Sequence, residues 1–457
     1  MASAMQWLPN LKKNNPNYNI KDEYSKMMNQ LEKPRDTNTA KFKPTIKNKS
    51  STIVGGSDAI KLIKSNGNNH YIVATRDIKS GEFIYINKPF EMITSVGKCY
   101  TTCWHCYRQT WSSVACDKCS CIIFCSQKCK DIAWNEYHDL ECLILSLFLK
   151  LDLMDDEDKP LYHLTIKILS KALKATGGIA ELKKKINDID SMKDTSMIYT
   201  DDIFDVNTLD NFYRLDYYKP TSDECSFERA IDISAIVETF SKMTNIFGRK
   251  LRPVDSVILG GLIFRHLMIV ERNVMRYTDD VSKNLSLTFA AIMPIREMFV
   301  KNCDPHVNWC NCEPNDTFLA QRPIKKGEKI SISLVGRYQK DTLSERQMRL
   351  EALDLKPCKC STCVQNLPLL ENLPSYKSLK LSKQVQQELD CIVLKLGDYF
   401  GLIVEENTEK LLKRKDTFAE ITDKFYQHVT VPCQEASFFS LMLEKLYHQL
   451  ANQRRII

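Results

Sequence analysis

The sequence lacks the features that would place a protein in a membrane or outside the cell. No apolar stretch follows its basic start, and no apolar run approaches the length of a membrane span. We therefore expect no membrane segment and an intracellular location, in the nucleus, the cytoplasm or both. Without a secretory signal, the 18 cysteines indicate bound zinc and reduced thiols instead of disulfides. We take the chain to be a monomer.

A strong charge of one sign is also missing. The formal net charge of +7 is small for 457 residues, and much of it comes from the first fifty residues, which are rich in Lys and Asn and contain no Gly. This composition predicts a loosely ordered, basic leader over residues 1–60. Such a leader can contact nucleic acid, but a solvated tail is the preferred interpretation. The rest of the chain has room for about two to four domains.

What the sequence does have is a dense set of metal-ligand pairs. They are Cys103-x2-Cys106, Cys116-x2-Cys119, Cys125-x3-Cys129 and His138-x3-Cys142. Two tetrahedral zinc ions need eight donors, and this segment of roughly forty residues supplies them. So short a segment buries too little apolar surface to fold alone, and zinc binding becomes its folding free energy. Cys99 and Cys121 lie close by; each is either a spare thiol, the preferred interpretation, or a competing zinc ligand.

The sequence also contains an internal repeat. Residues 74–86 (ATRDIKSGEFIYI) are echoed by residues 320–332 (AQRPIKKGEKISI), and each copy predicts a strand, a turn and a second strand. Gly81 and Gly327 stand where such a turn favours a residue that tolerates positive φ. Two similar β-units this far apart indicate one β-rich domain with long insertions.

Helical periodicity is found in the remaining segments. Residues 143–151 and 161–173 carry apolar residues at helical spacing, and residues 380–457 predict about three amphipathic helices. Residues 194–228, with many acids and few apolar runs, predict a loop or short helices. The predicted fold class is α+β and multidomain.

Four segments together resemble the SMYD family, in which a SET lysine-methyltransferase domain is split by a MYND zinc finger. They are residues 69–77 (NHYIVATRD), similar to the arthropod form of the family, 244–247 (TNIF), 291–306 (AIMPIREMFVKNCDPH) and the motif Cys358-x-Cys360-x2-Cys363. The resemblance implies a β-rich SET fold split by a two-zinc MYND finger, a post-SET zinc motif and a C-terminal helical block.

The same resemblance implies a division of the chain into seven parts. The leader occupies residues 1–60, the first SET part 61–98, the MYND finger 99–142, a helical insert 143–240, the second SET part 241–340, the post-SET motif 341–366 and the C-terminal helical domain 367–457.

In the family, the zinc ligands pair in crossed order, the first pair with the third and the second with the fourth. This implies one zinc on Cys103, Cys106, Cys125 and Cys129, and a second on Cys116, Cys119, His138 and Cys142. A third zinc is implied on Cys303, Cys358, Cys360 and Cys363. Cys310 and Cys312 remain the alternative to Cys303, although a motif placed there leaves too few residues for the hairpin expected over 307–320. The expected cofactor is zinc, about three ions.

The sequence departs from the family where S-adenosylmethionine binds and where catalysis takes place. The family's Asn-His dipeptide is replaced by Val300 and Lys301, and its catalytic tyrosine by Leu334. Tyr338 lies four residues further on, but a strand shift of four residues would misplace the whole edge. The cofactor-binding positions that the resemblance implies are Asn69, Tyr71, Asn245, Val300 and Lys301, and Asn69 stands where the family has glycine.

These departures favour an interaction protein over an enzyme. The preferred interpretation is a catalytically impaired, SMYD-like scaffold in transcriptional or chromatin regulation, with S-adenosylmethionine binding disfavoured. The alternative is an active S-adenosylmethionine-dependent protein-lysine methyltransferase.

Protein partners are expected at the MYND finger, in the form of proline-containing peptides. The aromatic candidates for packing on prolines are Trp104, Tyr107, Trp111 and Trp134. For Trp134, covering the zinc core is an equally good interpretation.

Overall fold

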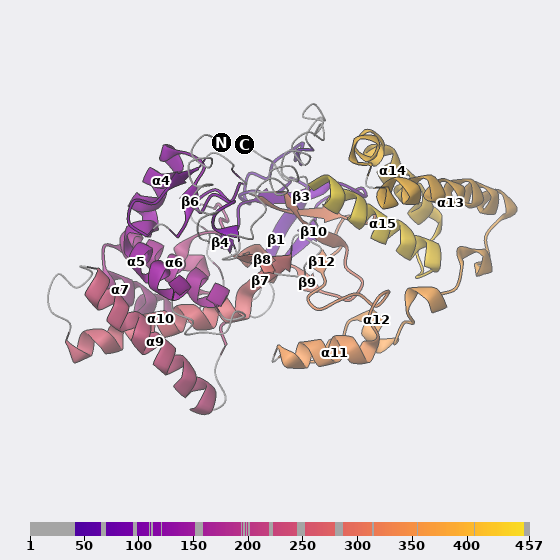
Figure 1. Ribbon diagram of the computed structural model, residues 1–457. Coiled ribbons are helices and arrows are strands. Elements are labelled where there is room, and N and C mark those ends of the chain that lie inside the picture. The colour runs from indigo at the N-terminus through magenta and orange to yellow at the C-terminus, as the bar shows by residue number, and fades with distance from the viewer. Residues whose placement is uncertain are drawn as a thin grey trace, which may run out of the picture. The chain divides into compact units, whose positions relative to one another are not determined.

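The computed structural model of the chain describes residues 42–451 apart from short gaps (Figure 1). The gaps are residues 65–69, 95–97, 109, 111–112, 120, 151–158, 193, 195–196, 198, 200–201, 219–222, 245–251, 279–286, 313–314, 354 and 406. Most of the predicted leader over residues 1–60 therefore lies outside the described residues.

The strands are β1 (Ile60–Lys64), β2 (His70–Ala74), β3 (Phe83–Asn87), β4 (Glu91–Thr94), β5 (Val114–Ala115), β6 (Ile123–Phe124), β7 (Val274–Thr278), β8 (Leu287–Ile292), β9 (Val300–Lys301), β10 (Val307–Cys312), β11 (Asn315–Ala320) and β12 (Ser331–Ile332). The α-helices are α4 (Gln127–Ala133), α5 (Asp139–Lys150), α6 (Lys159–Thr176), α7 (Ile179–Asp190), α8 (Leu209–Tyr213), α9 (Asp223–Met243), α10 (Pro253–Asn273), α11 (Leu343–Ala352), α12 (Ser361–Val364), α13 (Lys383–Val404), α14 (Thr408–His428) and α15 (Gln434–Ala451). Shorter helical turns are η2 (Trp134–His138), η3 (Pro294–Met298), η4 (Leu370–Asn372) and η5 (Tyr376–Ser378).

The two copies of the sequence repeat pair with each other. The amide of Gly81 donates to the carbonyl of Ala320 (N to O, 2.7 Å), and the amide of Gly327 donates to the carbonyl of Ala74 (2.9 Å). An isoleucine halfway along each copy forms a β-bridge with its counterpart. Each turn is thus fixed by a hydrogen bond to the other copy. The chain segment between the two copies therefore begins and ends at this pairing.

Both repeat glycines have the predicted positive φ, +73° for Gly81 and +88° for Gly327. A Cβ added to Gly81 would lie 2.9 Å from the hydroxyl oxygen of Tyr447 and 3.1 Å from the Cβ of Ala419, whereas one on Gly327 would meet nothing within 4 Å. Glycine is therefore required at position 81 for two reasons: the positive φ, and the close approach of α14 and α15.

Small sheets surround this pairing. Strands β10 and β11 form the predicted antiparallel hairpin, and β11 also pairs with β3. Strand β8 lies between β4 and β7 in a second antiparallel sheet. Strands β9 and β12 are parallel, with Val300 opposite Ser331 and Lys301 opposite Ile332. This pairing places the expected cofactor segment beside the end of the second repeat.

The helices between the two repeats only partly follow the predictions. Helices α5 and α6 occupy the segments predicted to be helical, and the short helix α8 agrees with the short helices predicted over residues 194–228, but the long helix α9 begins within that segment, at Asp223. Helix α10 is not predicted at all. It begins with Pro253, and the carboxylate of Asp255 accepts a hydrogen bond from the amide of Arg252 (3.0 Å), a combination that favours a helix start.

Helix α10 also corrects the expectation that no apolar run approaches a membrane span. By length and composition it is long and apolar enough to cross a membrane. However, 50% of its most apolar window is buried inside the protein, where the helix packs on α6 and α9. A buried core helix passes the same test, so this is only a weak indication of a membrane segment.

A buried lysine on α6 joins the helical insert to β4 and to the zinc segment. The side chain of Lys167 is 1% exposed, and its Nζ lies 3.2 Å from Oε1 of Glu91 in β4. The rings of Trp104, Tyr107 and Tyr137 lie around the ammonium group, with centres 5.9, 4.8 and 4.6 Å from Nζ. Aromatic faces stabilise a desolvated cation, so charge and packing act together here.

The carboxylate of Glu91 balances two cations. Nζ of Lys171 lies 2.6 Å from its second oxygen, Oε2. Burial alone would raise the pKa of Glu91, but the ammonium groups of Lys167 and Lys171 outweigh it and lower this pKa to about 2. The group is therefore ionised at neutral pH.

Helices α13, α14 and α15 are the three helices predicted over residues 380–457, and they pack on one another while α15 lies against β10. The ring of Tyr447 in α15 meets Phe83 of β3 edge-on, at 5.5 Å between centres. The thiol of Cys310 in β10 donates to the carbonyl of Tyr447 (3.4 Å). The C-terminal helices thus share a core with the repeat-containing strands.

We expect Glu91→Gln to lower the free energy of unfolding by roughly 3 kcal/mol, because a neutral amide leaves Lys167 buried without its counter-charge. The control is Glu238→Gln, which removes the exposed pair with Lys242 on α9 and should leave stability unchanged. Urea unfolding of both zinc-loaded variants measures the difference. Equal urea midpoints for the two variants would show that the burial of Lys167 does not require the negative charge of Glu91.

Candidate metal centres and cofactor cavity

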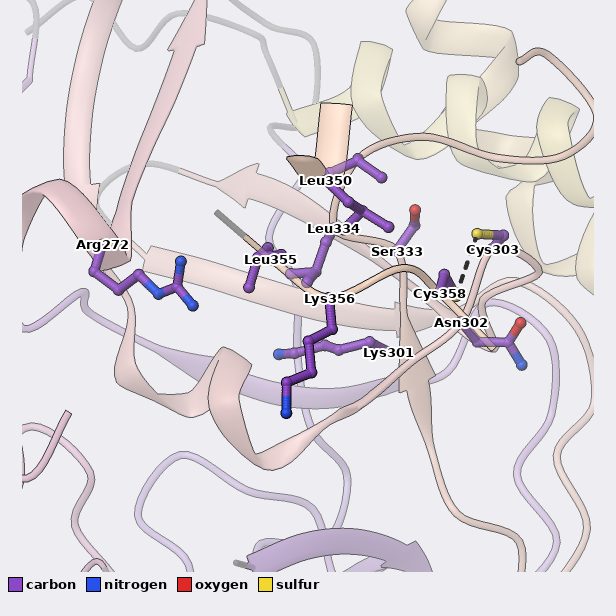
Figure 2. Close-up of a pocket in the computed structure, with 11 residues that line it drawn as sticks. Arg272, Lys301, Asn302, Cys303, Ser333, Leu334, Leu350, Leu355, Lys356 and Cys358 are labelled. Atoms are coloured by element: carbon purple, nitrogen blue, oxygen red, sulfur yellow. Dashed lines mark hydrogen bonds between the residues drawn. The ribbon is translucent and has the colours of Figure 1, made fainter. Parts of the chain in front are cut away.

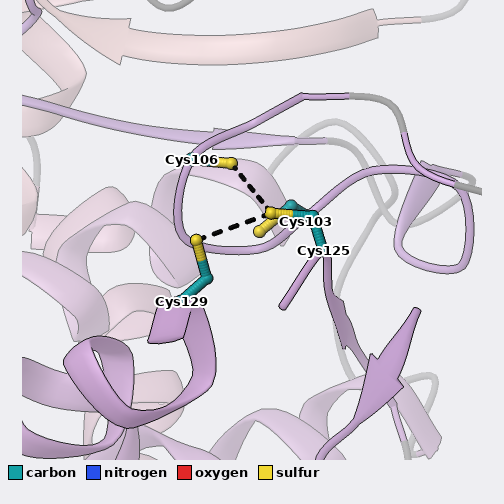
Figure 3. Close-up of side chains that lie close together, drawn as sticks. All are labelled: Cys103, Cys106, Cys125 and Cys129. Atoms are coloured by element: carbon teal, nitrogen blue, oxygen red, sulfur yellow. Dashed lines mark hydrogen bonds between the residues drawn. The ribbon is translucent and has the colours of Figure 1, made fainter. Parts of the chain in front are cut away.

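Four cysteines of the zinc segment converge on one point (Figure 3). The sulfurs of Cys103, Cys106, Cys125 and Cys129 all lie within 4.8 Å of one another. Sγ of Cys125 is 3.6 Å from that of Cys106 and 3.5 Å from that of Cys129, close to the edge of about 3.8 Å that Zn–S bonds give a tetrahedron. Ser126 caps α4 by accepting a hydrogen bond from the amide of Cys129 (3.2 Å), which fixes this ligand at the helix start.

A second group of four contains the histidine. Its members are Cys116, Cys119, His138 and Cys142, again within 4.8 Å of one another. Nε2 of His138 lies 3.3 Å from Sγ of Cys116, while Nδ1 lies 3.0 Å from Oε1 of Glu141. A carboxylate behind a histidine orients the ring and raises its basicity, which suits a zinc ligand. The structure therefore brings the pairs together in crossed order.

The two remaining cysteines of this region take no part in either group. The thiol of Cys121 donates to the carbonyl of Cys119 (2.9 Å), and Cys99 is buried with 3% exposure. Both lie in the small core around the two metal centres, as spare thiols would.

The structure contradicts two of the four aromatic candidates for a peptide groove. Trp104 is 2% exposed, and its Nε1 donates to Oε1 of Glu141 (2.8 Å). Tyr107 is 7% exposed, and its hydroxyl bonds to Oε1 of Glu91 (3.0 Å). Both rings belong to the buried contact around Lys167, so neither can pack on a partner. Trp111 lies outside the described residues.

Trp134 is the candidate that remains. It is half-buried, meets the ring of His138 edge-on at 5.9 Å, and carries the ammonium of Lys118 4.6 Å from its ring centre. The ring therefore covers the metal centre and also lines a hollow of about 480 Å³. The other residues that line this hollow are Cys116, Asp117, Lys118, Gln127, Lys130, Asp131 and Asn135.

The third group of four is formed by Cys303, Cys358, Cys360 and Cys363, within 4.8 Å of one another. Sγ of Cys303 lies 3.4 Å from that of Cys363. Cys310, one of the alternatives to Cys303, instead points into the core beneath α15. The side chain of Cys312 is outside the described structure. Among the described cysteines, Cys303 is therefore the one that completes the site.

Next to this third centre lies a cavity of about 390 Å³ (Figure 2). A second cavity, of about 890 Å³, shares with it the side chains of Arg272, Lys301, Leu334 and Leu355. Ligand pockets typically fall in this range of volumes. Lys301 reaches them from β9, and Leu334 follows β12, so the parallel pairing of these strands sets both side chains at the wall. Of the five positions that the resemblance implies for S-adenosylmethionine, Lys301 is the one that lines these cavities among the described residues.

The ammonium group of Lys301 is held inside the cavity wall. It donates to the carbonyl of Arg296 and lies 3.5 Å from Oε1 of Glu297. Burial lowers the pKa of Lys301 to about 8, against the opposing effect of Glu297. At pH 7 the group is therefore mostly protonated, and the cavity carries its positive charge.

The other expected cofactor positions lie elsewhere or are not described. Val300 is half-buried and lines neither cavity, and the ring of Tyr71 lies 4.3 Å beneath Nζ of Lys329. Asn69 and Asn245 fall outside the described residues. Sequence reasoning missed Arg272 and Lys356, which come from the end of α10 and from the segment after α11, because no motif marks them.

The neutral polar side chains in the described lining of the smaller cavity are the amide of Asn302 and the hydroxyl of Ser333. Leu334 offers no hydroxyl or amide, and the smaller cavity presents three cations, Arg272, Lys301 and Lys356, but no carboxylate among its described residues. A sulfonium carries a positive charge and would be repelled there. The three cysteine-rich groups, by contrast, have the donors and spacing of zinc sites.

We expect the purified protein to contain about three zinc ions, with Cys303→Ser lowering the content by one, because three ligands hold zinc poorly. The matched control is Cys310→Ser, a buried cysteine outside the site, which should leave the zinc content unchanged. Inductively coupled plasma analysis of folded protein gives the ratio. Zinc loss in Cys310→Ser but not in Cys303→Ser would show that Cys310, and not Cys303, is the fourth ligand of the third site.

Comparison with known proteins agrees with this geometry. The SET domain family model matches residues 69–333, more than half of the chain. A SET and MYND domain-containing protein of Dictyostelium discoideum is 24% identical over 322 residues, which cover 67% of this chain and 82% of that protein. Protein-lysine N-methyltransferase SMYD4 is 24% identical over 378 residues in Mus musculus (68% and 46% covered) and 23% over 385 in Homo sapiens (70% and 48%). The chain thus spans about half the length of these SMYD4 relatives. It belongs to the SET domain family and, within it, to the SET and MYND domain proteins of the SMYD type.

Proposed function

We propose that this SET and MYND domain protein is catalytically impaired and acts as a protein-interaction scaffold in transcriptional or chromatin regulation. The observation that carries the proposal is Leu334 at the cavity wall. In the family this position holds the catalytic tyrosine. A leucine side chain cannot orient an attacking lysine amine or stabilise charge that develops in the transition state.

Tyr338 does not supply the missing hydroxyl. Its ring is 2% exposed, and its hydroxyl lies 3.3 Å from Oγ of Ser437 on α15. It is not among the described residues that line either cavity. The nearest tyrosine along the chain therefore serves the packing of the C-terminal helices.

The charge of Lys301 also supports the proposal. A sulfonium placed ~5 Å from its ammonium would cost about 3 kcal/mol at an effective dielectric constant near 20. The carboxylate of Glu297, at 3.5 Å and partly exposed, offsets part of this repulsion.

The alternative is an active protein-lysine methyltransferase, which the names of the SMYD4 relatives suggest. One observation favours it: the space beside Lys301 and Leu334 is open, not filled by side chains. The experiments below distinguish the two functions.

For the partner site we propose the hollow beside Trp134, which would take a proline-containing peptide. The half-buried indole of Trp134 offers an aromatic surface for a pyrrolidine ring, and Asp117 and Asp131, which also line the hollow, can accept hydrogen bonds from backbone amides or a basic side chain. The resemblance to MYND fingers supports this choice of ligand.

We expect the unmodified chain to bind S-adenosylmethionine no tighter than about 1 mM, which corresponds to roughly 4 kcal/mol. Isothermal titration calorimetry on zinc-loaded protein measures this. Leu334→Tyr alone should not restore methyl transfer, because Val300 and Lys301 still replace the Asn-His pair. Only the triple change Val300→Asn, Lys301→His and Leu334→Tyr restores the asparagine, the histidine and the tyrosine of the family together. Micromolar binding by the unmodified chain would overturn the scaffold proposal and favour the methyltransferase.

Trp134→Ala should weaken binding of a synthetic proline-rich peptide by at least about tenfold, because truncating an aromatic anchor commonly removes 1.4 kcal/mol or more. The control is Tyr100→Ala, an aromatic residue of the same region that is 65% exposed and does not line the hollow. Fluorescence anisotropy with a labelled peptide compares them, after zinc analysis has shown that both variants are loaded. If the two variants bind alike, the peptide does not dock beside Trp134.

A further inference from the structure

The two cavities beside Lys301 differ in their charge. Among the described residues, the larger one is lined by four basic and four acidic side chains, namely Arg229, Arg272, Arg296, Lys301, Asp216, Glu271, Glu297 and Glu351. Several of these pair with each other, as Arg229 does with Glu271 at 2.7 Å. The charges of the larger cavity are therefore balanced internally.

The smaller cavity has no such balance. Its described lining contains Arg272, Lys301 and Lys356 and no carboxylate. Figure 2 shows the nitrogen ends of Arg272 and Lys301 directed into the same space, with Lys356 beside Lys301. Lys356 is exposed and has no ion pair or hydrogen bond to any residue that the structure describes. Among the described residues this cation thus has no partner, and it lines the cavity together with the other two.

The partners of the other two cations do not remove the imbalance. Arg272 lies 3.4 Å from Asp216, whose side chain is 72% exposed, and Lys301 lies 3.5 Å from Glu297, which is 43% exposed. Exposed acids at these distances are screened by solvent and contribute little. Both acids line the larger cavity, so the described lining of the smaller one retains an excess of positive charge.

The third metal centre is the other source of negative charge. Zinc with four thiolates carries about two net negative charges, and Cys303 and Cys358 reach the cavity. Arg346, which is 0% exposed, already places a guanidinium nitrogen 3.5 Å from Sγ of Cys363. About one negative charge of the cluster then remains against three cations.

The smaller cavity also has an apolar part of its lining. Leu334, Val335, Leu350 and Leu355 line it together with the three cations. Such a division suits a ligand with an anionic head and an apolar body. A volume of about 390 Å³ limits that ligand to a small molecule.

We propose that the smaller cavity binds a small organic anion, a phosphate or carboxylate whose head lies between Arg272, Lys301 and Lys356 and whose body packs on Leu334 and Leu355. Leu334, which has no hydroxyl for catalysis, is then part of the ligand-binding surface. The inference goes beyond the scaffold function and gives the former cofactor region a ligand of opposite charge.

The test is calorimetry on zinc-loaded protein with three probes of similar body and different charge. Phenyl phosphate is the anion, benzyl alcohol is neutral, and benzyltrimethylammonium is the cation. We expect phenyl phosphate to bind at least about tenfold more tightly than benzyl alcohol, and the cation not to bind. Benzoate, run alongside, distinguishes a preference for phosphate from one for carboxylate.

Lys356→Gln should weaken phenyl phosphate binding by about tenfold, the loss of one charge-assisted contact. Since Lys356 is exposed, its replacement should not disturb folding. The matched control is Lys340→Gln, an exposed lysine nearby that does not line the cavity and removes the same charge. A similar loss in both variants would reduce the effect to overall charge and overturn the proposal.

The remaining outcomes separate this inference from the scaffold proposal. If neither phenyl phosphate nor S-adenosylmethionine binds, the anion site is wrong and the scaffold function stands. If S-adenosylmethionine binds at micromolar concentration and phenyl phosphate does not, both are wrong. Anion binding that responds to Lys356→Gln, without S-adenosylmethionine binding, supports both.

Discussion

The fold depends on the mutual pairing of two short β-units that are far apart in the sequence. The amides of Gly81 and Gly327 each donate to a strand of the other copy. The residues between the two copies therefore form one long loop that begins and ends at this pairing. Closing so long a loop costs conformational entropy, although the cost rises only slowly with length. Each inserted part must therefore supply its own folding free energy. The zinc segment does so with two metal centres, and α6 does so by burying most of its apolar residues, while the Lys167–Glu91 pair joins α6 to β4.

The parts that could be predicted from the sequence are those fixed by local chemistry. Ligand spacing within each pair identified the donors, and the Lys-x-Gly-Glu turns identified the repeat because positive φ selects glycine. The β10–β11 hairpin and the three C-terminal helices follow from turn residues and periodicity over a few residues. The crossed order of the zinc pairs came only from the resemblance, since spacing alone does not say which pairs meet.

The parts that could not be predicted depend on contacts between distant segments. Trp104 and Tyr107 look like surface aromatics of a zinc finger, and only the docking of Lys167 between them makes them core residues. Arg272 and Lys356 stand 84 positions apart with no motif around either, yet they line one cavity. Helix α10 was not predicted because its apolar residues run around most of the helix and show no one-sided periodicity, as expected for a core helix packed on two neighbours.

The contrast between intact metal centres and an altered cavity has a thermodynamic explanation. A structural zinc ligand contributes directly to folding, so a change at Cys303 or His138 would act on stability. A catalytic hydroxyl contributes to the transition state and not to the fold, and leucine at position 334 leaves the β9–β12 pairing in place. Of the cations that line the cavity, Lys356 is exposed and costs the fold little, whereas the buried ammonium group of Lys301 is stabilised by the carbonyl of Arg296 and by Glu297. On this argument, the proposed scaffold function and the proposed anion site both follow from one separation, between the residues that stabilise the fold and the residues that determine what the cavity binds.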